Sequence, residues 1–360
     1  MATISLCMIV KNEEAVIERI LRIMKDIADE IIIADTGSED RTKEIAYKYT
    51  TNVFDFIWCD DFSAARNFVW NKAKMDYRMW LDADDIITEK WQKELKKLKA
   101  TIDMNTDVVM MKYVTGFDEN NEPNFFYYRE RLIKNSPKYI WEGKVHEAIV
   151  PNGNVIYSDI EIEHRKEKKD NSNRNLKIYE NIFKRGEKAD PRSKFYYGRE
   201  LYYNGKYNEA EKVLIDFLSE GEGWIENNID ACLHLSYCYE KLGIYEKRIG
   251  ALFYSFCFDV PRAEICCEAG RAFMEKEEYK RAVYWYKEAL KAEYDEYSGG
   301  FVQKDFYDYV PFIQLCVCYD KLGDYKKAFE YHKLSKKVKP KSEAVKYNEK
   351  YFNKLFENNA

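Results

Sequence analysis

The hydrophobic periodicity of this chain changes once, close to Asp190 and Pro191. Before that point, short runs of β-branched residues alternate with amphipathic stretches, a pattern typical of a mostly parallel sheet covered by helices. After it, the apolar residues follow a helical period of 3.6 and strand signals are nearly absent. We therefore expect an α/β domain over residues 1–185 and an all-α domain over residues 186–360.

Composition narrows the class of protein. The 360 residues are 46% hydrophobic and 34% charged, with 7 Pro and 15 Gly, which excludes collagen-like, disordered and membrane-bundle chains. The net charge of −5 gives no general attraction to nucleic acid or anionic lipid. No apolar run approaches the roughly 18 residues of a membrane span. Nine cysteines without a C-x-x-C pair favour free thiols in a reducing compartment. We expect a cytoplasmic protein without a nucleic-acid partner or membrane span.

Polar clusters follow the predicted strands of the first half. We predict strands over 4–10, 31–34, 53–58 and 77–81, and helices over 13–25 and 63–74. In open α/β sheets, ligands bind beyond the carboxyl ends of the strands. The residues at those ends are Asn12-Glu13, Asp35 to Ser38, Asp60 to Asn67, and Asp82 to Asp85. These four clusters predict one binding site at that edge.

The cluster at Asp82 and Asp84 suggests a divalent cation. Carboxylate oxygens suit Mg²⁺ or Mn²⁺, which usually need one or two carboxylates besides substrate phosphates. A lone D-x-D is weak evidence, because Asp-rich strand ends are often turns and helix caps. The chain has neither G-x-G-x-x-G nor a G-x-x-x-x-G-K-[ST] loop, which argues against a dinucleotide fold of the usual sort and a P-loop NTPase.

Four ordered segments resemble glycosyltransferase family 2. They are Ser5 to Glu14, Ala34 to Thr42, Phe62 to Asn67 and Trp80 to Asp85. The resemblance implies the GT-A fold, a Rossmann-like sheet in which the first loop and the Asp of the second strand hold the nucleoside of a nucleotide-sugar. By the same resemblance, the D-x-D motif holds metal and diphosphate. The residues that this assigns are Val10, Asn12 and Asp35 for the nucleoside, Arg66 near base and phosphate, Asp82 and Ala83 for the sugar nucleotide, and Asp84 for the metal.

The segment from Trp141 to Ala148 carries a second group of candidates. It also resembles family 2 members with tetratricopeptide repeats, including the bacteriocin peptide S-glycosyltransferases, which implies Glu147 as general base and His164 as third metal ligand. For an isolated His, a structural role bonded to the backbone is the alternative. The basic segment 165–175 is interpreted either as a solvated linker or as a lid over the diphosphate. Further candidates for an acceptor or lid role are Arg131, Trp141, His146 and Arg174.

The second half contains a repeat. A turn-to-helix junction recurs four times, at Gly205 to Ala210, Gly243 to Tyr245, Tyr279 to Ala282 and Gly323 to Ala328. Tyr245 and Tyr279 lie 34 residues apart, the tetratricopeptide period. Such repeats stack into a superhelix whose concave face suits an extended peptide or another subunit. Most tyrosines of this half, out of 30 in the chain, are then packing residues.

The sequence as a whole predicts a metal-dependent, inverting glycosyltransferase that uses Mn²⁺ or Mg²⁺ and a UDP-sugar donor. Inversion is implied by the family resemblance alone. The acceptor is a peptide or protein side chain, or alternatively a glycan, and the repeats bind that acceptor or form a homodimer. A repeat scaffold with an inactive transferase domain is the rival from another class. A nucleotidyltransferase is disfavoured because residues 11–14 do not form a Gly- or Lys-rich phosphate loop.

Overall fold

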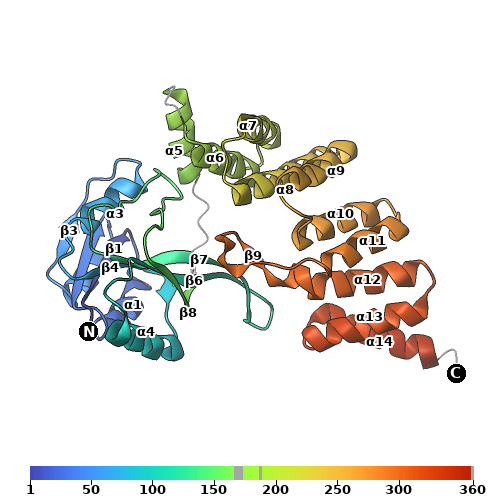
Figure 1. The fold of residues 1–360 in the computed structure, drawn as a ribbon, viewed down its shortest axis with the longest axis horizontal. Helices are drawn as coiled ribbons and strands as arrows, with labels where there is room; N and C mark the ends of the chain where they lie inside the picture. The colour runs from blue at the N-terminus through green and yellow to red at the C-terminus, as the bar shows by residue number, and fades with distance from the viewer. Residues whose placement is uncertain (166–172, 186–188, 358–360) are drawn as a thin grey trace. The chain divides into compact units, whose positions relative to one another are not determined.

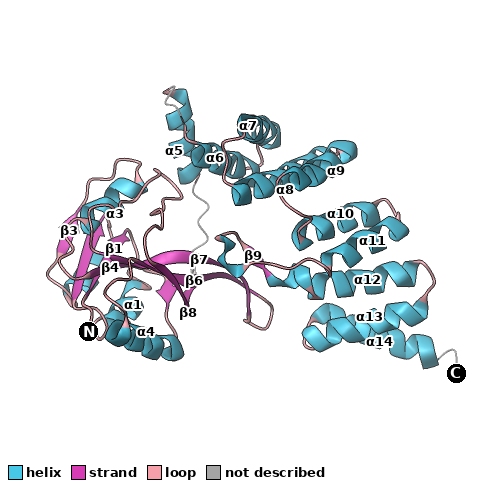
Figure 2. Cartoon of the chain, in the orientation of Figure 1, coloured by secondary structure: helices cyan, strands magenta, loops and turns pink. Residues whose placement is uncertain are grey.

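The computed structural model describes residues 1–165, 173–185 and 189–357. These residues form two compact units, one of residues 1–115 and 126–185 and the other of residues 116–125 and 189–357. The first unit is α/β and the second is helical apart from a short hairpin segment and strand β9 (Figures 1 and 2). The predicted order, an α/β part followed by an all-α repeat part, is confirmed.

The first unit is a mixed sheet with helices on both faces (Figure 1). Along the main path, the strand order is β3-β2-β1-β4-β7-β6-β8-β5. Its strands are β1 (Ile4–Val10), β2 (Glu30–Asp35), β3 (Val53–Asp55), β4 (Tyr77–Trp80), β5 (Asp85–Ile86), β6 (Val108–Phe117), β7 (Pro123–Lys134) and β8 (Val155–His164). Its helices are α1 (Ile17–Met24), α2 (Thr42–Tyr47), α3 (Phe62–Trp70), α4 (Glu89–Thr101) and α5 (Arg174–Lys184).

Strand β1 runs parallel to its two neighbours, β2 and β4, and β2 is parallel to β3. Successive side chains of a strand point to opposite faces, so Leu6 and Met8 join one hydrophobic core while Cys7 joins the other. Both faces are covered, which explains why the strand sequence is apolar at nearly every position. Because the parallel strands β1, β2 and β4 end at the same edge, the polar residues that follow them are brought together there.

The other half of the sheet departs from the simple parallel expectation. Strand β7 pairs antiparallel with β4, and β5 pairs antiparallel with β8, whereas β6 and β8 are parallel. The sequence interpretation did not include β8. Its sequence alternates polar and apolar residues and buries Ile160 and Ile162 on one face only, so it lacks the continuous apolar run of the central strands. This omission matters because His164 ends β8.

The second unit consists mainly of antiparallel helix pairs (Figure 1). The helices are α6 (Pro191–Tyr203), α7 (Tyr207–Glu220), α8 (Ile225–Leu242), α9 (Tyr245–Tyr254), α10 (Ala263–Glu275), α11 (Tyr279–Ala289), α12 (Tyr309–Lys321), α13 (Tyr325–Val338) and α14 (Glu343–Glu357). The turns inside three pairs place Gly205, Gly243 and Gly323 at positive φ, where a side chain is strained. Glu277 takes this position in the remaining pair, with φ of 59°.

The tip of the β6–β7 hairpin, residues 116–125, packs within the helical unit. Asp118 lies 3.2 Å from the Nζ of Lys339, which also binds Asp305 at 2.7 Å. The ring of Phe125 stacks on that of Phe301 with centroids 5.5 Å apart. The short strand β9 (Val302–Gln303) pairs with β7. The hairpin tip, although it comes from the first half of the chain, therefore packs within the helical unit.

Two further expectations can be compared with the described residues. The nine cysteines are free thiols, and seven of them are buried. Among the helices that the structure describes, none combines the length and the apolar character needed to cross a membrane.

Candidate active site

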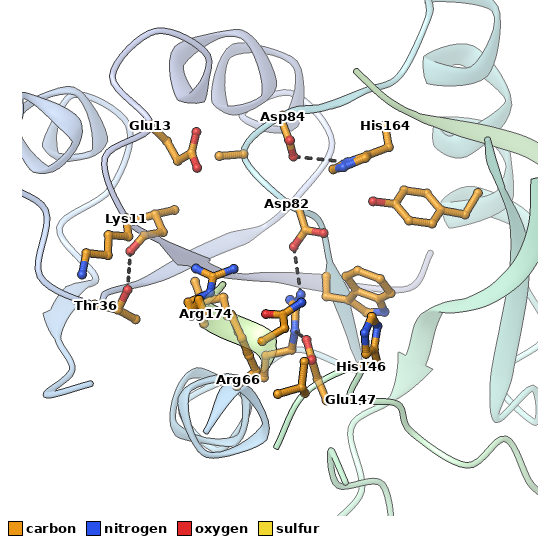
Figure 3. Close-up of a pocket in the computed structure, with 18 of the residues that line it drawn as sticks. Lys11, Glu13, Thr36, Arg66, Asp82, Asp84, His146, Glu147, His164 and Arg174 are labelled. Carbon is orange, nitrogen blue, oxygen red and sulfur yellow. Dashed lines mark hydrogen bonds and ion pairs between the residues drawn. The ribbon is translucent and has the colours of Figure 1, made fainter. Parts of the chain in front are cut away.

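A pocket of about 820 Å³ opens at the edge where the parallel strands end (Figure 3). Its volume is in the range of small-molecule and cofactor sites. Nine of the thirteen residues singled out from the sequence line it: Val10, Arg66, Asp82, Ala83, Asp84, His146, Glu147, His164 and Arg174. The other four, Asn12, Asp35, Arg131 and Trp141, are not among the lining residues. Of those four, Arg131 donates a hydrogen bond to the backbone oxygen of the lining residue Trp80, and the ring of Trp141 contacts the guanidinium of Arg66.

Asp35 shapes the loop beside the pocket. Its Oδ1 accepts hydrogen bonds from the backbone N–H groups of Gly37 and Ser38, at 2.9 and 2.7 Å. Its Oδ2 is buried and has no hydrogen-bond partner among the described residues. Asn12 sits opposite at φ of 56°, and its side-chain oxygen accepts from the N–H of Glu39 at 2.8 Å. Asp35 thus keeps one acceptor oxygen available next to the pocket residue Thr36.

Asp84, Asp85 and His164 form a cluster whose ligand atoms lie within 4.8 Å of one another. The pairing of β5 with β8 places Asp85 directly across from His164. The Nδ1 of His164 approaches Asp84 at 3.3 Å and Asp85 at 3.5 Å. That nitrogen and the Oδ1 of Asp85 are buried without a hydrogen-bond partner among the described residues. One nitrogen and two carboxylate oxygens fit a divalent cation of the Mn²⁺ or Mg²⁺ type.

The two carboxylates of this cluster favour a positive charge beside them, either a proton on His164 or a bound cation. Burial alone would lower the pKa of His164, but the carboxylates of Asp84 and Asp85 raise it to about 10. A proton on the imidazole therefore balances the two acids when no cation is bound. A cation bound there would take the place of that proton, because a metal-ligating His must be neutral.

Arg131 lies behind the pocket, where it supports the acidic loop. Its side chain and that of Asp85 are fully buried and are joined at 3.1 Å. The same Nη1 donates to the backbone oxygen of Trp80 at 3.1 Å. Asp85 Oδ2 in turn accepts from the N–H of Asp82 at 3.0 Å. Arg131 is therefore positioned to hold the turn that carries the D-x-D residues, and it does not line the cavity as an acceptor or lid residue would.

Arg66 joins two acids from distant parts of the chain (Figure 3). Its Nε donates to Oε1 of Glu147 at 2.5 Å, and its Nη2 donates to Oδ1 of Asp82 at 2.9 Å. The guanidinium packs against the rings of both Trp80 and Trp141, at 4.9 and 4.8 Å from their centroids. Burial would raise the pKa of Asp82, but the charges of Arg66, Arg131 and His164 and the hydrogen bond from Arg66 together outweigh burial and lower that pKa to about 2.

The loop that carries Glu147 is held at both ends. Glu142 and Ala148 exchange backbone hydrogen bonds of 2.9 and 3.0 Å, which closes the loop. At its start, the backbone of Trp141 exchanges two hydrogen bonds of 2.9 Å with the side chain of Asn67. His146 has φ of 53°, a conformation that is unusual for a residue with a side chain, and it lines the pocket.

Arg174 lies at the first turn of α5 and lines the pocket from that side. Its guanidinium sits 4.7 Å from the ring centre of Phe62, and that ring contacts Trp58 edge to face at 4.8 Å. Of the basic segment 165–175 interpreted as linker or lid, residues 166–172 lie outside the described residues.

Several lining residues were missed by the sequence interpretation. They are Lys11, Trp58, Tyr113, Tyr127 and Arg129, among others, and Asp85 was not named as a metal ligand. A signal was available for part of this set, because Tyr127, Arg129 and Arg131 alternate along β7 and must share one face.

Comparison with known proteins identifies the first unit. The family model described as glycosyl transferase family 2 matches residues 5–157. Residues 5–157 form a glycosyltransferase family 2 domain. This match covers the four segments that carry the resemblance and the loop of Glu147, so the family expected from the sequence is confirmed.

Curated relatives resemble parts of the chain. A TPR repeat-containing protein of Synechococcus elongatus is 36% identical over 151 residues, which are 41% of this chain and 36% of that protein. The SPbeta prophage-derived glycosyltransferase SunS of Bacillus subtilis is 27% identical over 237 residues, which are 61% of this chain and 53% of that protein. The chain thus spans about half or less of the length of these relatives. Among solved structures, pilF of Pseudomonas aeruginosa has a TM-score of 0.38 at 14% identity, covering 49% of this chain and 72% of that one.

Proposed function

We propose that this protein is a metal-dependent, inverting glycosyltransferase that takes a sugar from a UDP-sugar. The observation that carries the proposal is one pocket of a family 2 domain with Asp82, Asp84 and His164 on one wall and Glu147 on another. The first group suits a diphosphate and its cation, and the second suits the proton of an acceptor. Inversion follows from the family resemblance.

The donor would bind across the ends of the parallel strands. Val10 lines this part of the pocket and Asn12 shapes the neighbouring loop. Oδ2 of Asp35, which has no hydrogen-bond partner among the described residues, would accept from an N–H of the base. Asp82 and Ala83 line the position proposed for the diphosphate. Asp84 and His164 would hold the Mn²⁺ or Mg²⁺ ion, with Asp85 within reach. The bound cation would neutralise charge on the leaving diphosphate.

Glu147 would act as general base. Its Oε1 accepts from Arg66, whereas its Oε2 makes no hydrogen bond or ion pair with the described residues. In the proposed step, Glu147 takes the proton of the acceptor, the acceptor atom bonds to the anomeric carbon, and the electron pair of the broken carbon–oxygen bond leaves with UDP. Arg174 and His146 line the same cavity and are proposed to contact acceptor or diphosphate.

The acceptor is proposed to be a peptide or protein side chain, because stacked helix pairs suit an extended peptide. A glycan acceptor is the alternative. The repeats would select that acceptor or join two copies of the chain, and light scattering of the purified protein would distinguish a dimer from a monomer. Cytoplasmic location remains a prediction from the free thiols.

The deciding experiment measures UDP binding and UDP release. We expect UDP to bind more tightly with Mn²⁺ or Mg²⁺ than without, and the protein to release UDP slowly from at least one of a panel of UDP-sugars with water as acceptor. Asp84→Ala should abolish the metal dependence of binding while thermal stability is retained. Equal affinity with and without metal in the unmutated protein would contradict the metal assignment. Metal-dependent binding with no UDP release from any donor, even with candidate acceptors, would favour the inactive scaffold.

The role of Glu147 is tested by the pair Glu147→Gln and Glu142→Gln. Loss of a general base typically costs about 10²- to 10⁴-fold in rate. Glu147→Gln should therefore lose most of its turnover and retain UDP affinity, whereas Glu142→Gln, in the same loop but exposed and outside the lining, should retain both. Normal turnover in Glu147→Gln would remove this residue from the mechanism.

A further inference from the structure

We propose that Arg66 is a positioning residue that sets Glu147, the acceptor side of the site, at a fixed place relative to Asp82, the donor side. The inference rests on the proposed function and departs from the expectation that Arg66 itself holds base and phosphate. The carboxylates of Asp82 and Glu147 come from sequence positions 16 and 81 residues away from Arg66, respectively. Both depend on one guanidinium.

The contacts of Arg66 leave little of it for a ligand. Its side chain is 9% exposed, and two of its nitrogens are committed to carboxylates at 2.5 and 2.9 Å. Each carboxylate uses one oxygen on Arg66. The contacts recorded among the described residues engage neither Oδ2 of Asp82 nor Oε2 of Glu147, although both residues line the pocket. Arg66 thereby orients each acid through one oxygen and leaves the other for chemistry, as the partner of a catalytic base does.

The surroundings of Arg66 restrict its motion. The guanidinium packs against Trp80 and Trp141, whose rings contact each other edge to face with centroids 5.2 Å apart. The next residue in the sequence, Asn67, binds the backbone of Trp141 through two hydrogen bonds. Two consecutive residues of α3 therefore hold the loop of Glu147 at its start, through Asn67, and near its end, through Arg66.

A second arginine supports the same loop from the sheet. Nη2 of Arg129 donates to the backbone oxygen of Glu147 at 3.2 Å, while its guanidinium binds Glu130. The backbone of Glu147 is thus held by β7 and its carboxylate by α3. On the acceptor side, loss of Arg66 therefore frees the carboxylate of Glu147 but leaves the backbone of Glu147 held by Arg129.

The planar fork of Arg is essential to this arrangement. Its nitrogens are fixed relative to one another, so two carboxylates bound to them are also fixed relative to one another. Lysine preserves the charge but presents a single ammonium on a flexible stem, which does not impose that geometry. Arg66→Lys should therefore misplace Glu147 without removing the positive charge from the site.

The experiment measures UDP·Mn²⁺ affinity and the saturating rate of UDP release from the most active UDP-sugar, in the full chain. Arg66→Lys should lower kcat by about 10- to 100-fold, the effect of a small misplacement, and keep UDP affinity within about threefold. The matched control is Arg78→Lys. Arg78 is buried and lies 5.4 Å from the ring of Trp70, but it is outside the pocket lining, and its kcat should be unchanged.

A double-mutant cycle with Glu147→Gln isolates the mechanism. If Arg66 acts through Glu147, the variant with both changes should have the kcat of Glu147→Gln alone, because residues that act as a unit are not additive. Independent, multiplicative losses would overturn the proposal. So would an Arg66→Lys variant with normal kcat and weakened UDP binding, which would make Arg66 a donor ligand.

Chemical rescue provides a second test of the role of Arg66. Guanidinium ion added to Arg66→Ala should restore part of kcat, and methylammonium should not. If Arg66→Ala does not fold, the cycle with Arg66→Lys still decides. An unmutated protein that binds no UDP and releases none from any UDP-sugar would instead refute the proposed function, and this inference with it.

Discussion

The two units of this protein handle buried polar groups differently. In the family 2 unit, charged side chains are buried beneath the pocket and bridge distant segments, as with Arg131 and Asp85. In the helical unit, many ion pairs join neighbouring turns of one helix at the surface, as with Lys346 and Glu343. The close packing there comes from small residues, such as Gly270 against the ring of Tyr286. The buried charges of the first unit lie beneath its pocket, whereas the buried Arg248 of the second unit joins neighbouring helices of the stack through Glu240 and Glu275.

The largest effect on stability should come from breaking the buried pair in the first unit. Arg131→Met leaves Asp85 buried without its partner, and such a loss costs about 3–5 kcal/mol. The control, Arg281→Met, breaks an exposed pair with Glu278 and should cost about 1 kcal/mol or less. Urea denaturation followed by the fluorescence of tryptophans in the two units measures both. Equal losses of unfolding free energy in Arg131→Met and Arg281→Met would contradict the difference between the buried and the exposed pair.

An intermediate effect is expected from the packing of the repeats. A Cβ added at Gly270 would lie 2.8 Å from the ring of Tyr286, so Gly270→Ala should cost about 1–3 kcal/mol. Gly250 is also helical but has open space around it, and Gly250→Ala should stabilise by about 0.5–1 kcal/mol. Thermal denaturation should show shifts of opposite sign. A stabilising Gly270→Ala would mean that these helices are not closely packed there.

The smallest expected effect is a difference between the two units in how their stability depends on pH. Asp82 has a pKa of about 2 in the folded protein, below its ordinary value of 3.8, so its stabilisation is present above pH 4 and is lost as the pH falls toward 2. Burial raises the pKa of Glu264 in the repeats, so its folded-state cost is present at neutral pH and is relieved as the pH falls.

Substitutions isolate these two groups. Glu264→Gln should raise the melting temperature of the helical unit at pH 8 and have little effect at pH 4. Asp82→Asn should lower the melting temperature of the first unit at pH 7 and remove part of its acid sensitivity. Parallel pH dependence of the two variants would contradict the opposite pKa shifts.

Sequence alone determined the features that depend on neighbours along the chain. The apolar runs predicted β1 and β2 to within one residue at each end, and the repeated turn-to-helix junctions predicted the helix pairs. The polar clusters at strand ends predicted the lining residues Glu13, Thr36, Arg66, Asp82 and Asp84, because parallel strands that end at one edge bring their following loops together. Glu147 and His164 were instead predicted from the family resemblance. The local pattern was sufficient to predict the residues that follow parallel strands, because those strands end at the same edge of the sheet.

Tertiary structure decided which charges meet. The register between β5 and β8 sets Asp85 across from His164, and the placement of α3 sets Arg66 between Asp82 and Glu147. Neither contact produces a periodic pattern in the sequence, because each depends on strand pairing or helix packing between segments far apart in the chain. The same holds for residues 116–125, which continue two strands of the sheet yet pack with the repeats. Local sequence determines the helices and strands, whereas strand pairing and helix packing determine which charged side chains contact one another.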